Sequence, residues 1–500
     1  MAVLTFRDTT KTLGIILLSI LTLPFSLTVT SLLFLAHLII GHYPRHATKF
    51  QVQYEADFKN IPCQKTILVT GVGMTKGLTL ARAFHRQGHR VLGADFEDAL
   101  VPSSGRQSRS LSNFHSLRKP SSKLLSSSYT AQLVDLVTRE NVDLWVSCSG
   151  VATAAEDGAA ADQIEQLTNC RCVQFTEKVT TRLHEKNSFI RETIRLGLRV
   201  PETHEVAAHQ DVLRVLDRSG RGRRFIMKPV GMDDAHRGNM TLLPLATPAE
   251  TKKHVLDLPI SSATPWIVQQ FIPGEREYCT HALIVKGQVK LFTACPSSEL
   301  LMHYKALPAH SQLFRDMLKF TKDFCAKSED SKSMTGHLSF DFMADENGAL
   351  HAIECNPRVH TAVVLFSQPR KVARDMVQAY LSVLEDDESQ ANVNGHVNEI
   401  VLPDPHAAPR YWIGHDVVEL GLLPIIKMIR GDAKLSKVKE SVTELWLHIK
   451  SWKEGSFEAQ DPLPTLMLYH VYWPLTVAAA WWHGRRWSRL NVSTTKMFMV

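Results

Sequence analysis

The feature that most constrains this chain is a long uncharged stretch near its start. Between Lys11 and Arg45 there is no Lys, Arg, Asp or Glu, and residues 13–40 are almost wholly apolar. A helix of that length, at about 1.5 Å per residue, can cross a bilayer. The apolar run is too long for a signal peptide and no clear cleavage site follows it, so we expect a membrane anchor over 1–50. Because Pro24 divides the apolar run, a re-entrant hairpin stays an alternative. Basic residues flank the run on both sides, so they do not decide the orientation of the segment in the membrane.

The end of the chain carries a second apolar segment. Residues Leu463–Trp482 are apolar and aromatic, and a cluster of three arginines follows them. Tryptophan and tyrosine beside basic residues suit a membrane interface. A histidine and a proline inside the segment disfavour a clean span. A membrane-associated tail over 457–500 and a helix buried against the main body both remain open.

Composition indicates a folded, reduced protein between these ends. The 500 residues are 44% hydrophobic and 21% charged, which excludes a disordered chain. The net charge of +7 suits phosphates or an anionic membrane face, and we expect no nucleic-acid partner. The eight cysteines have no zinc or disulfide-frame spacing, so we expect cytosolic thiols.

Residues 60–175 predict a parallel α/β domain. A β-rich run, Lys65–Thr70, precedes the glycine-rich loop GVGMTKG, a helical pattern and a second strand over Arg90–Asp95. Glycines between a strand and a helix favour phosphate at the helix N-terminus, but they also serve tight packing alone. The Ser-rich stretch Ser103–Ser128 lacks apolar periodicity and is predicted as a loop or covering segment.

Residues 176–385 have a different pattern, in which short helices alternate with antiparallel-looking strands. This indicates an α+β unit. A helix is expected over Thr176–Leu196. Asp386–Glu399 is acidic and rich in asparagine, so 386–456 is expected to be a linker and accessory region. The expected strands are Arg224–Pro229, Trp266–Ile272, Tyr278–Val285, Gln288–Ala294, His337–Met343 and Leu350–Glu354.

Polar residues on two of these strands form the strongest chemical pattern. Asp341 lies between two phenylalanines, and Glu354 and Asn356 lie two positions apart on the next strand. Strand side chains alternate between faces, so Glu354 and Asn356 share a face, and Asp341 joins them if the strands pair. Two carboxylates and an amide oxygen suit Mg²⁺ shared with nucleotide phosphates. Arg358 follows two positions later and can stabilise a phosphoryl group or an oxyanion.

Residues upstream of this pattern suit a nucleotide. Lys228 ends an apolar strand, where an isolated ammonium is costly and a phosphate would satisfy it. The polar loop Gly231–Asn239 follows and can close over phosphates. Pro265–Gly274 is an apolar strand that runs into a short linker, as in many adenine slots, where the backbone of Gln270–Ile272 would contact the base edge. Glu277 lies within reach of ribose or metal.

In this order, these residues resemble the ATP-grasp superfamily over about residues 176–385. The hydrophobic ends resemble, more loosely, membrane-associated ATP-grasp enzymes of fungal secondary-metabolite clusters. The resemblance implies a Rossmann-like pre-ATP-grasp domain followed by a two-subdomain ATP-grasp fold. It rests on Lys186 before a helix, Pro201, Lys228-Pro229, the loop Gly231–Gly238, Gln269–Glu277, Asp341 and Glu354–Arg358.

The resemblance also implies roles for single residues. Arg358 and Lys228 would be catalytic, and Arg358 would steady the phosphoryl group. ATP would phosphorylate a small-molecule carboxylate, and an amine would attack the acyl phosphate to give an amide. The nucleotide would be held by Lys186, Lys228, Gln269, Gln270, Phe271, Ile272 and Glu277, and Mg²⁺, or Mn²⁺, by Asp341, Glu354 and Asn356.

Two departures from the family pattern concern the nucleotide. The loop Gly231–Asn239 is poorer in glycine than expected, and Gln269 and Gln270 stand where an acid often receives the adenine amino group. The substrate pocket has weaker candidates. They are His360 and Thr361 after Arg358, and Glu299, His303 and Tyr304 in a polar connector, where His303 alone resembles an ordinary surface histidine.

Four functions follow from these patterns. The leading one is a membrane-associated carboxylate–amine ligase of specialised metabolism with a cytosolic catalytic domain, for which a homo-oligomer stays open. The second is a bicarbonate-using carboxylase or carbamoyl-phosphate-like enzyme. The third is a membrane-tethered nucleotide-binding scaffold without turnover. The fourth is an oxidoreductase that uses GVGMTKG, for which no acid–base pair stands near the loop.

Overall fold

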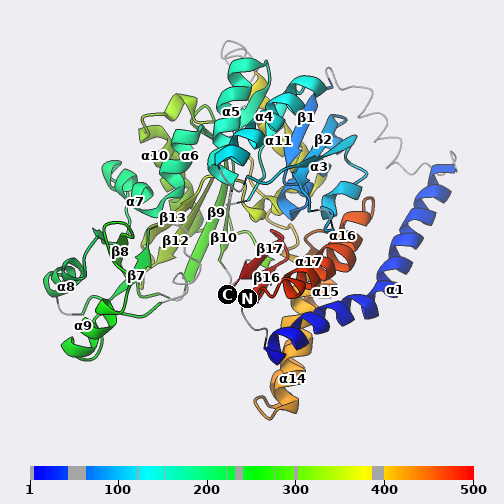
Figure 1. Ribbon diagram of the computed structural model, residues 1–500. Helices are drawn as coiled ribbons and strands as arrows, with labels where there is room; N and C mark the ends of the chain where they lie inside the picture. Colours follow the sequence, from blue (N-terminus) through cyan, green and yellow to red (C-terminus); the bar gives the residue numbers. More distant parts are fainter. Residues whose placement is uncertain are drawn as a thin grey trace.

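The chain forms two central sheets with a small sheet at one end and a long N-terminal helix at the other (Figure 1). That helix is α1 (Phe6–His42). The computed structural model describes residues 5–42, 64–98, 100–120, 123–150, 153–220, 222–230, 240–274, 276–297, 302–385 and 399–499.

The first sheet confirms the predicted parallel α/β unit. Its five strands run parallel in the order β3-β2-β1-β4-β5. The strands are β1 (Thr66–Thr70), β2 (Arg90–Phe96), β3 (Asn113–Leu117), β4 (Leu144–Val146) and β5 (Arg171–Val173). The helices of this unit are α3 (Thr75–Arg86), α4 (Lys123–Glu140) and α5 (Ala154–Leu167).

The prediction of a loop over Ser103–Ser128 is wrong in part. The stretch contains a short helical turn η2 (Ser104–Gln107), strand β3 and the start of α4. β3 is an edge strand with one partner, and only Leu117 of its five residues is fully buried. An edge strand with little apolar content gives a weak alternation signal.

The second sheet is antiparallel in the order β10-β9-β12-β13, as the strand patterns predict. Phe340 and Phe342 of β12 are fully buried, and the Phe340 ring lies 5.1 Å from that of Phe324 on the covering helix. Asp341, between them, therefore faces the opposite side. The elements are β9 (Arg276–Val285), β10 (Gln288–Pro296), β12 (Gly336–Ala344), β13 (Leu350–Asn356) and helix α10 (Gln312–Lys327).

The helix predicted over Thr176–Leu196 is two helices, α6 (Glu177–His184) and α7 (Lys186–Arg195). The break occurs at Glu185, whose backbone is extended, with φ −77° and ψ 119°. The consequence is that Lys186 becomes the first residue of α7.

A small antiparallel sheet, in the order β6-β8-β7, projects from the second sheet (Figure 1). Its core is apolar and includes the buried residues Val212, Phe225, Val255 and Trp266. The elements are β6 (Thr203–Val206), β7 (Phe225–Pro229), β8 (Trp266–Gln270) and the helices α8 (His209–Arg218) and α9 (Pro248–Leu256).

One apolar core joins the parallel sheet to the antiparallel sheet. It contains Val69 of β1, Leu283 of β9, Phe366 of the turn η6 (Thr361–Phe366) and Tyr380 of α11 (Arg370–Leu381). The two sheets are therefore fixed to each other by hydrophobic burial. The seven cysteines that the structure describes are free and buried, in agreement with reduced thiols.

Residues 399–454 fold onto the body. A three-stranded sheet joins β11 (His303–Tyr304), β14 (Arg410–Tyr411) and β15 (Lys453–Glu454). Two helices between β14 and β15 form a projecting hairpin (Figure 1). The elements from β14 to the hairpin's end are α13 (Ile413–Asp416), the π-helical turn η8 (Val417–Leu422), α14 (Leu423–Ile429) and α15 (Leu435–Ser451).

The described part of the tail packs against the body and α1, as in the buried-helix alternative. Trp473 and Val477 are 3% and 0% exposed. His470 hydrogen-bonds Ser19 and Ser26 of α1, and α1 contacts α17. The tail consists of α16 (Leu463–Met467), the π-helical turn η9 (Leu468–Tyr472), α17 (Trp473–Trp482), β16 (Trp487–Asn491) and β17 (Lys496–Met499).

Helix α1 is the one helix among the described residues that is long and apolar enough to cross a membrane. Its candidate span runs over Asp8–Ile39 with a mean hydropathy of 2.1, and 6% of that window is buried. The helix continues through Pro24, so the re-entrant hairpin is not formed. This agreement with the predicted anchor rests on length and composition.

Candidate active site

One face of the antiparallel sheet gathers the predicted metal ligands. Asp341 of β12 pairs directly with Glu354 of β13 and with Cys279 of β9. Residues opposite each other, and residues two apart, share a face, so Asn356 and Glu277 lie on this face as well. Asn356 Nδ2 donates to Asp341 Oδ2 at 3.0 Å. The structure thus brings Asp341, Glu354 and Asn356 together.

The two predicted phosphate lysines reach this face from different elements. Lys186 Nζ, at the start of α7, lies 3.0 Å from Glu354 Oε2. Lys228, near the end of β7, donates to Gln269 Oε1 at 3.3 Å. The charges of Lys228, Glu354 and Lys186 all act on the pKa of Glu277, so these residues form one electrostatic cluster.

Burial and neighbouring carboxylates raise the pKa values of Asp341 and Glu277 in this cluster. Burial, followed by the charges of Glu354 and Glu277, raises the pKa of Asp341 well above its ordinary value, while Arg358 and Lys186 act in the opposite direction. Burial also raises the pKa of Glu277. A divalent cation would relieve such repulsion, and hard carboxylate and amide oxygens are the ligands that Mg²⁺ prefers. The residues present therefore fit the ion.

The segment predicted to hold adenine lies at the end of β8, and both of its glutamine side chains form hydrogen bonds within the protein. Gln269 is 2% exposed, and its amide also donates to Thr203 Oγ1 at 3.3 Å. Gln270 Oε1 accepts from the backbone N–H of Glu202 at 3.3 Å. Gln269 therefore positions Lys228 rather than presenting a free amide to a base. Phe271 and Ile272 follow directly, and Ile272 is 4% exposed.

The glycine-rich loop GVGMTKG is filled by the chain's own groups. The backbone N–H of Gly73 donates to Asp95 Oδ2 at 2.6 Å, and that of Thr75 at the start of α3 donates to the carbonyl of Ser493 at 3.0 Å. A Cβ on Gly105 would lie 2.1 Å from the Val72 carbonyl oxygen. These contacts support the tight-packing alternative, because the chain's own groups already bind the backbone N–H groups of Gly73 and Thr75.

Lys76 of the same loop is a residue that sequence reasoning missed. Its side chain is buried, and Nζ donates to the carbonyls of Ser149 at 3.1 Å and Val359 at 3.0 Å. Burial, and then the charge of Arg358, lower the pKa of Lys76 to about 8. Lys76 thus ties the parallel sheet to the segment that carries Arg358. A single lysine in a glycine loop gave no signal for this contact.

Three histidines extend the polar face near Arg358, of which His281 and His337 are buried and His360 is half-buried. The rings of His281 on β9 and His337 on β12 stack at 5.7 Å, and the His360 backbone N–H donates to His281 Nδ1 at 3.4 Å. Burial lowers the pKa of His337 and of His360 to about 3, and that of His281 well below its usual range. All three are therefore neutral at physiological pH.

The other substrate candidates fall into separate places. Tyr304 is buried, and its ring lies 5.7 Å from that of His360, while Thr361 is 3% exposed. His303 is not a lone surface histidine, because its Nε2 lies 2.8 Å from Asp416 Oδ1. The predicted loop Gly231–Asn239 and Glu299 lie outside the described residues.

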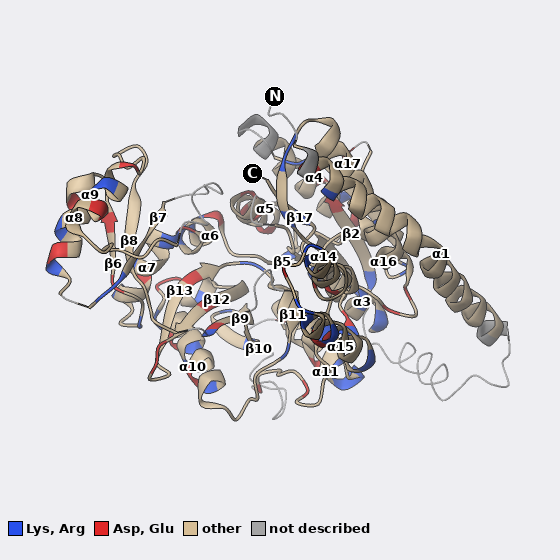
Figure 2. Ribbon diagram, turned by 90° about the horizontal axis from the view of Figure 1, so that it is seen from below, with Lys and Arg blue, Asp and Glu red and all other residues tan. Residues whose placement is uncertain are grey.

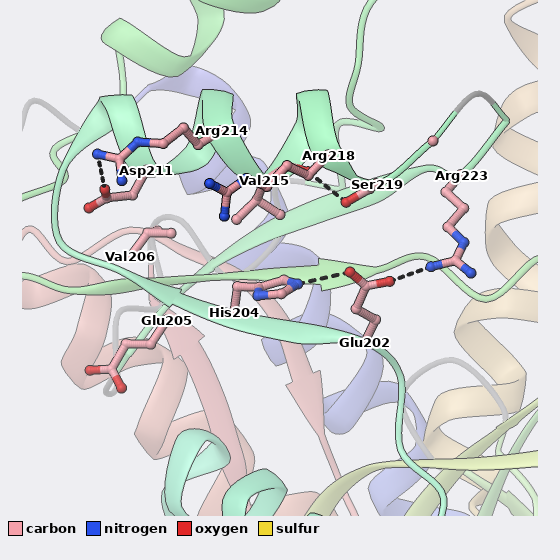
Figure 3. A pocket seen from close by; sticks show the side chains of 11 residues that line it. Glu202, His204, Glu205, Val206, Asp211, Arg214, Val215, Arg218, Ser219 and Arg223 are labelled. Atoms are coloured by element: carbon pink, nitrogen blue, oxygen red, sulfur yellow. Dashed lines mark hydrogen bonds and ion pairs between the residues drawn. The ribbon is translucent and has the colours of Figure 1, made fainter.

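A surface hollow of about 620 Å³ lies elsewhere, on the side of β6 that faces α8 (Figure 3). Five of its polar and charged side chains are paired with one another. Glu202 contacts His204 at 2.9 Å and Arg223 at 2.6 Å, and Asp211 contacts Arg214 at 2.9 Å. The hollow shares no residue with the cluster around Glu354.

The chain is similar in structure to ATP-grasp enzymes, as its motifs predict. One is N5-carboxyaminoimidazole synthetase from Staphylococcus aureus, at 13% identity and TM-score 0.46, covering 63% of this chain and 77% of that one. Another is L-amino acid ligase from Bacillus licheniformis, at 14% and 0.46, covering 67% and 78%. A third is biotin carboxylase from Campylobacter jejuni, at 13% and 0.48, covering 65% and 73%.

The sequence itself matches no family model and no curated protein. At identities of 11–14% and TM-scores of at most 0.49, the likeness concerns the fold. We therefore base the functional assignment on the geometry of the chain's own residues.

Proposed function

We propose that this chain is an ATP-dependent ligase of the ATP-grasp type, which activates a small-molecule carboxylate and joins it to an amine. The observation that carries the proposal is the meeting of cations and hard oxygen ligands from α7, β7, β9, β12 and β13 at one site. Its members are Lys186, Lys228, Glu277, Asp341, Glu354, Asn356 and Arg358.

Each side chain has a role in this proposal. Lys186 and Lys228 bind the ATP phosphates from two sides, and Arg358 stabilises the transferring phosphoryl group. Asp341, Glu354 and Asn356 hold Mg²⁺, or Mn²⁺, with Glu277 beside them. The ion supplies neutralisation of phosphate charge when bound. Gln269 keeps Lys228 in place through its 3.3 Å contact.

The proposed reaction has two steps. A carboxylate oxygen of the substrate attacks the γ-phosphorus of ATP, the bond to the bridging oxygen breaks, and ADP leaves. The amine nitrogen then attacks the acyl carbon and loses a proton, and inorganic phosphate leaves as the amide forms. The protein contributes positioning and charge stabilisation, as phosphoryl transfer requires.

Membrane association is part of the proposal and is supported by α1. The span over Asp8–Ile39 would tether the enzyme, with the catalytic domain in the cytosol where ATP is available. A role in specialised-metabolite biosynthesis rests on the resemblance of the hydrophobic ends to enzymes of such clusters.

The test is nucleotide turnover by the full-length chain in lipid nanodiscs with Mg²⁺ and pools of amino acids and organic acids. ADP and phosphate should appear only with a carboxylate and an amine present. Glu354→Gln should abolish the signal. Glu346→Gln is the matched control, because Glu346 is an exposed acid in the turn between β12 and β13.

Other outcomes separate the alternatives. Turnover that needs bicarbonate instead of an organic acid would indicate a carboxylase-like enzyme. AMP and pyrophosphate would mean adenylation and would exclude the acyl-phosphate route. Tight ATP binding without turnover against any pool would favour the scaffold.

A further inference from the structure

The helical hairpin formed by α14 and α15 exposes an apolar stripe. At its first helix, Leu422, Ile425, Ile426 and Ile429 are spaced i, i+3, i+4 and i+7, so they lie on one face. All four are exposed, and Ile429 is 77% exposed. A helix of a soluble protein normally buries a face of this kind.

The second helix, α15, has two different faces. Val438, Ser441 and His448 are buried. The other face carries Leu435 and Trp446, which are 56% and 62% exposed. The exposed face is therefore not the one that packs on the protein. We name the exposed apolar surface the hairpin stripe, which consists of Leu422, Ile425, Ile426, Ile429, Leu435, Val442, Trp446 and Ile449.

Basic residues surround the connection between the two helices. From Ile425 to Lys439 the chain has five basic residues against one acid, Asp432. Figure 2 shows basic residues along both α14 and α15. Large apolar residues, a tryptophan and an excess of Lys and Arg are the composition of helices that lie in the headgroup region of anionic bilayers. The five are Lys427, Arg430, Lys434, Lys437 and Lys439.

Helix α1 runs along one flank of the molecule, and the hairpin projects from its lower end in Figure 1. We propose that the hairpin stripe is a second membrane contact, which inserts into the headgroup region of an anionic leaflet. This contact is independent of the ligase activity.

The hairpin is fixed to the body where it begins. Asp416, just before η8, is fully buried, and its two carboxylate oxygens lie 2.8 Å from His303 Nε2 and 2.7 Å from His448 Nδ1. His303 belongs to β11 and His448 to α15. The contact links the start of the first hairpin helix, the second helix and the body, so docking of the stripe would orient the body against the bilayer.

The test uses the full-length chain in nanodiscs, with Cys63→Ser as background, because the seven described cysteines are buried. A fluorophore sensitive to polarity is attached at Ile429→Cys. The matched control is Leu167→Cys on α5, 69% exposed and at the opposite end of the molecule (Figure 1). In discs with phosphatidylserine and brominated lipid, we expect about twofold quenching at 429 and none at 167.

The charge contribution is tested by Lys434→Glu and Lys439→Glu in the 429-labelled chain, which leave the ion pair of Lys437 with Glu440 intact. Each change should weaken docking about fivefold in anionic discs and leave neutral discs unaffected. ATP turnover and the thermal midpoint should stay unchanged, which separates failure of this proposal from failure of the ligase proposal. Equal access of aqueous iodide to positions 429 and 167 would overturn it. If position 429 is shielded from iodide in detergent, and the shielding increases with protein concentration, the stripe binds a second copy of the chain and the proposal is overturned.

Discussion

Lys186 Nζ and Glu354 Oε2 lie 3.0 Å apart, and each side chain is about one-fifth exposed. The pair joins the first residue of α7 to β13, which carries two of the three predicted metal ligands. A lysine suited to phosphate and a carboxylate suited to a cation thus neutralise each other. When a magnesium–nucleotide complex binds, a phosphate would replace Glu354 as the partner of Lys186. The metal ion would replace Lys186 as the partner of Glu354.

This pairing makes Glu354→Gln the most informative substitution. The amide keeps the shape but removes the charge that would hold the cation and the partner of Lys186. We expect turnover to fall by about 100-fold or more, a size typical of losing one electrostatic group at a phosphoryl-transfer site. Initial rates across a Mg²⁺ titration measure it, with exposed Glu346→Gln as the control. Unchanged rates would contradict the assignment of Glu354.

Gln269 offers a second prediction, because it positions Lys228 through a 3.3 Å hydrogen bond from a buried site. Gln269→Leu should raise the KM for ATP about tenfold, since a lost hydrogen bond to a charged group costs about 1.5 kcal/mol or more. The change in kcat should be smaller.

The neighbouring substitution Gln270→Leu is the matched control, because Gln270 contacts the Glu202 backbone instead of the lysine. It should change KM by less than about twofold, as expected for a modest hydrogen bond. Gln269→Glu keeps an acceptor for Lys228 and should restore most of the affinity. If Gln269→Leu and Gln270→Leu changed the KM for ATP equally, Gln269 would not position Lys228.

The grouping of Asp341, Glu354 and Asn356 was predictable from the sequence because side chains alternate along these stretches of β12 and β13, although the pairing is irregular just after Asp341. Phe340 and Phe342 mark the buried face of β12, so Asp341 has to point the other way, and spacing by two places Glu354 with Asn356. Such arguments hold wherever one face of a strand is buried.

Other parts could not be predicted because they depend on distant partners. The loop GVGMTKG joins a strand to a helix, where glycines can favour phosphate, but the carbonyl of Ser493, far along the chain, accepts the hydrogen bond of the Thr75 N–H. The hairpin α14–α15 has an apolar periodicity that predicts burial, although the stripe is exposed. Local patterns do not encode which surface covers a helix end or a helix face.

Lys76 leads to a prediction about alkaline pH. Its pKa is lowered to about 8 in the folded chain by burial and Arg358, against an ordinary 10.5, so between these values the unfolded chain holds more protons. The contribution of Lys76 to the free energy of unfolding is fully present above pH 10.5 and is lost as the pH falls through 8. Relative to Lys76→Met, wild-type stability should rise by up to about 3 kcal/mol across this window. Urea unfolding at several pH values measures it, and parallel profiles would contradict it.

The histidines near Arg358 predict an acid-sensitive fold. His337 and His360 have pKa values lowered to about 3 by burial, so below the ordinary value of 6.5 the unfolded chain takes up protons that the folded chain does not. Stability is present above pH 6.5 and is lost as the pH falls toward 3. Each histidine should contribute about 1.4 kcal/mol per pH unit to that slope.

His337→Phe tests this slope directly, because the ring is buried and contacts Tyr380 at 2.9 Å through Nε2. The lost hydrogen bond shifts stability at every pH, whereas the lost titration changes only the slope. We therefore expect the variant's free energy of unfolding to fall less steeply between pH 6 and pH 4.5, by about 1.4 kcal/mol per unit. His310→Gln, an exposed histidine at the end of a loop before α10, should keep the wild-type slope. An unchanged slope in His337→Phe would mean that His337 is already protonated in the fold.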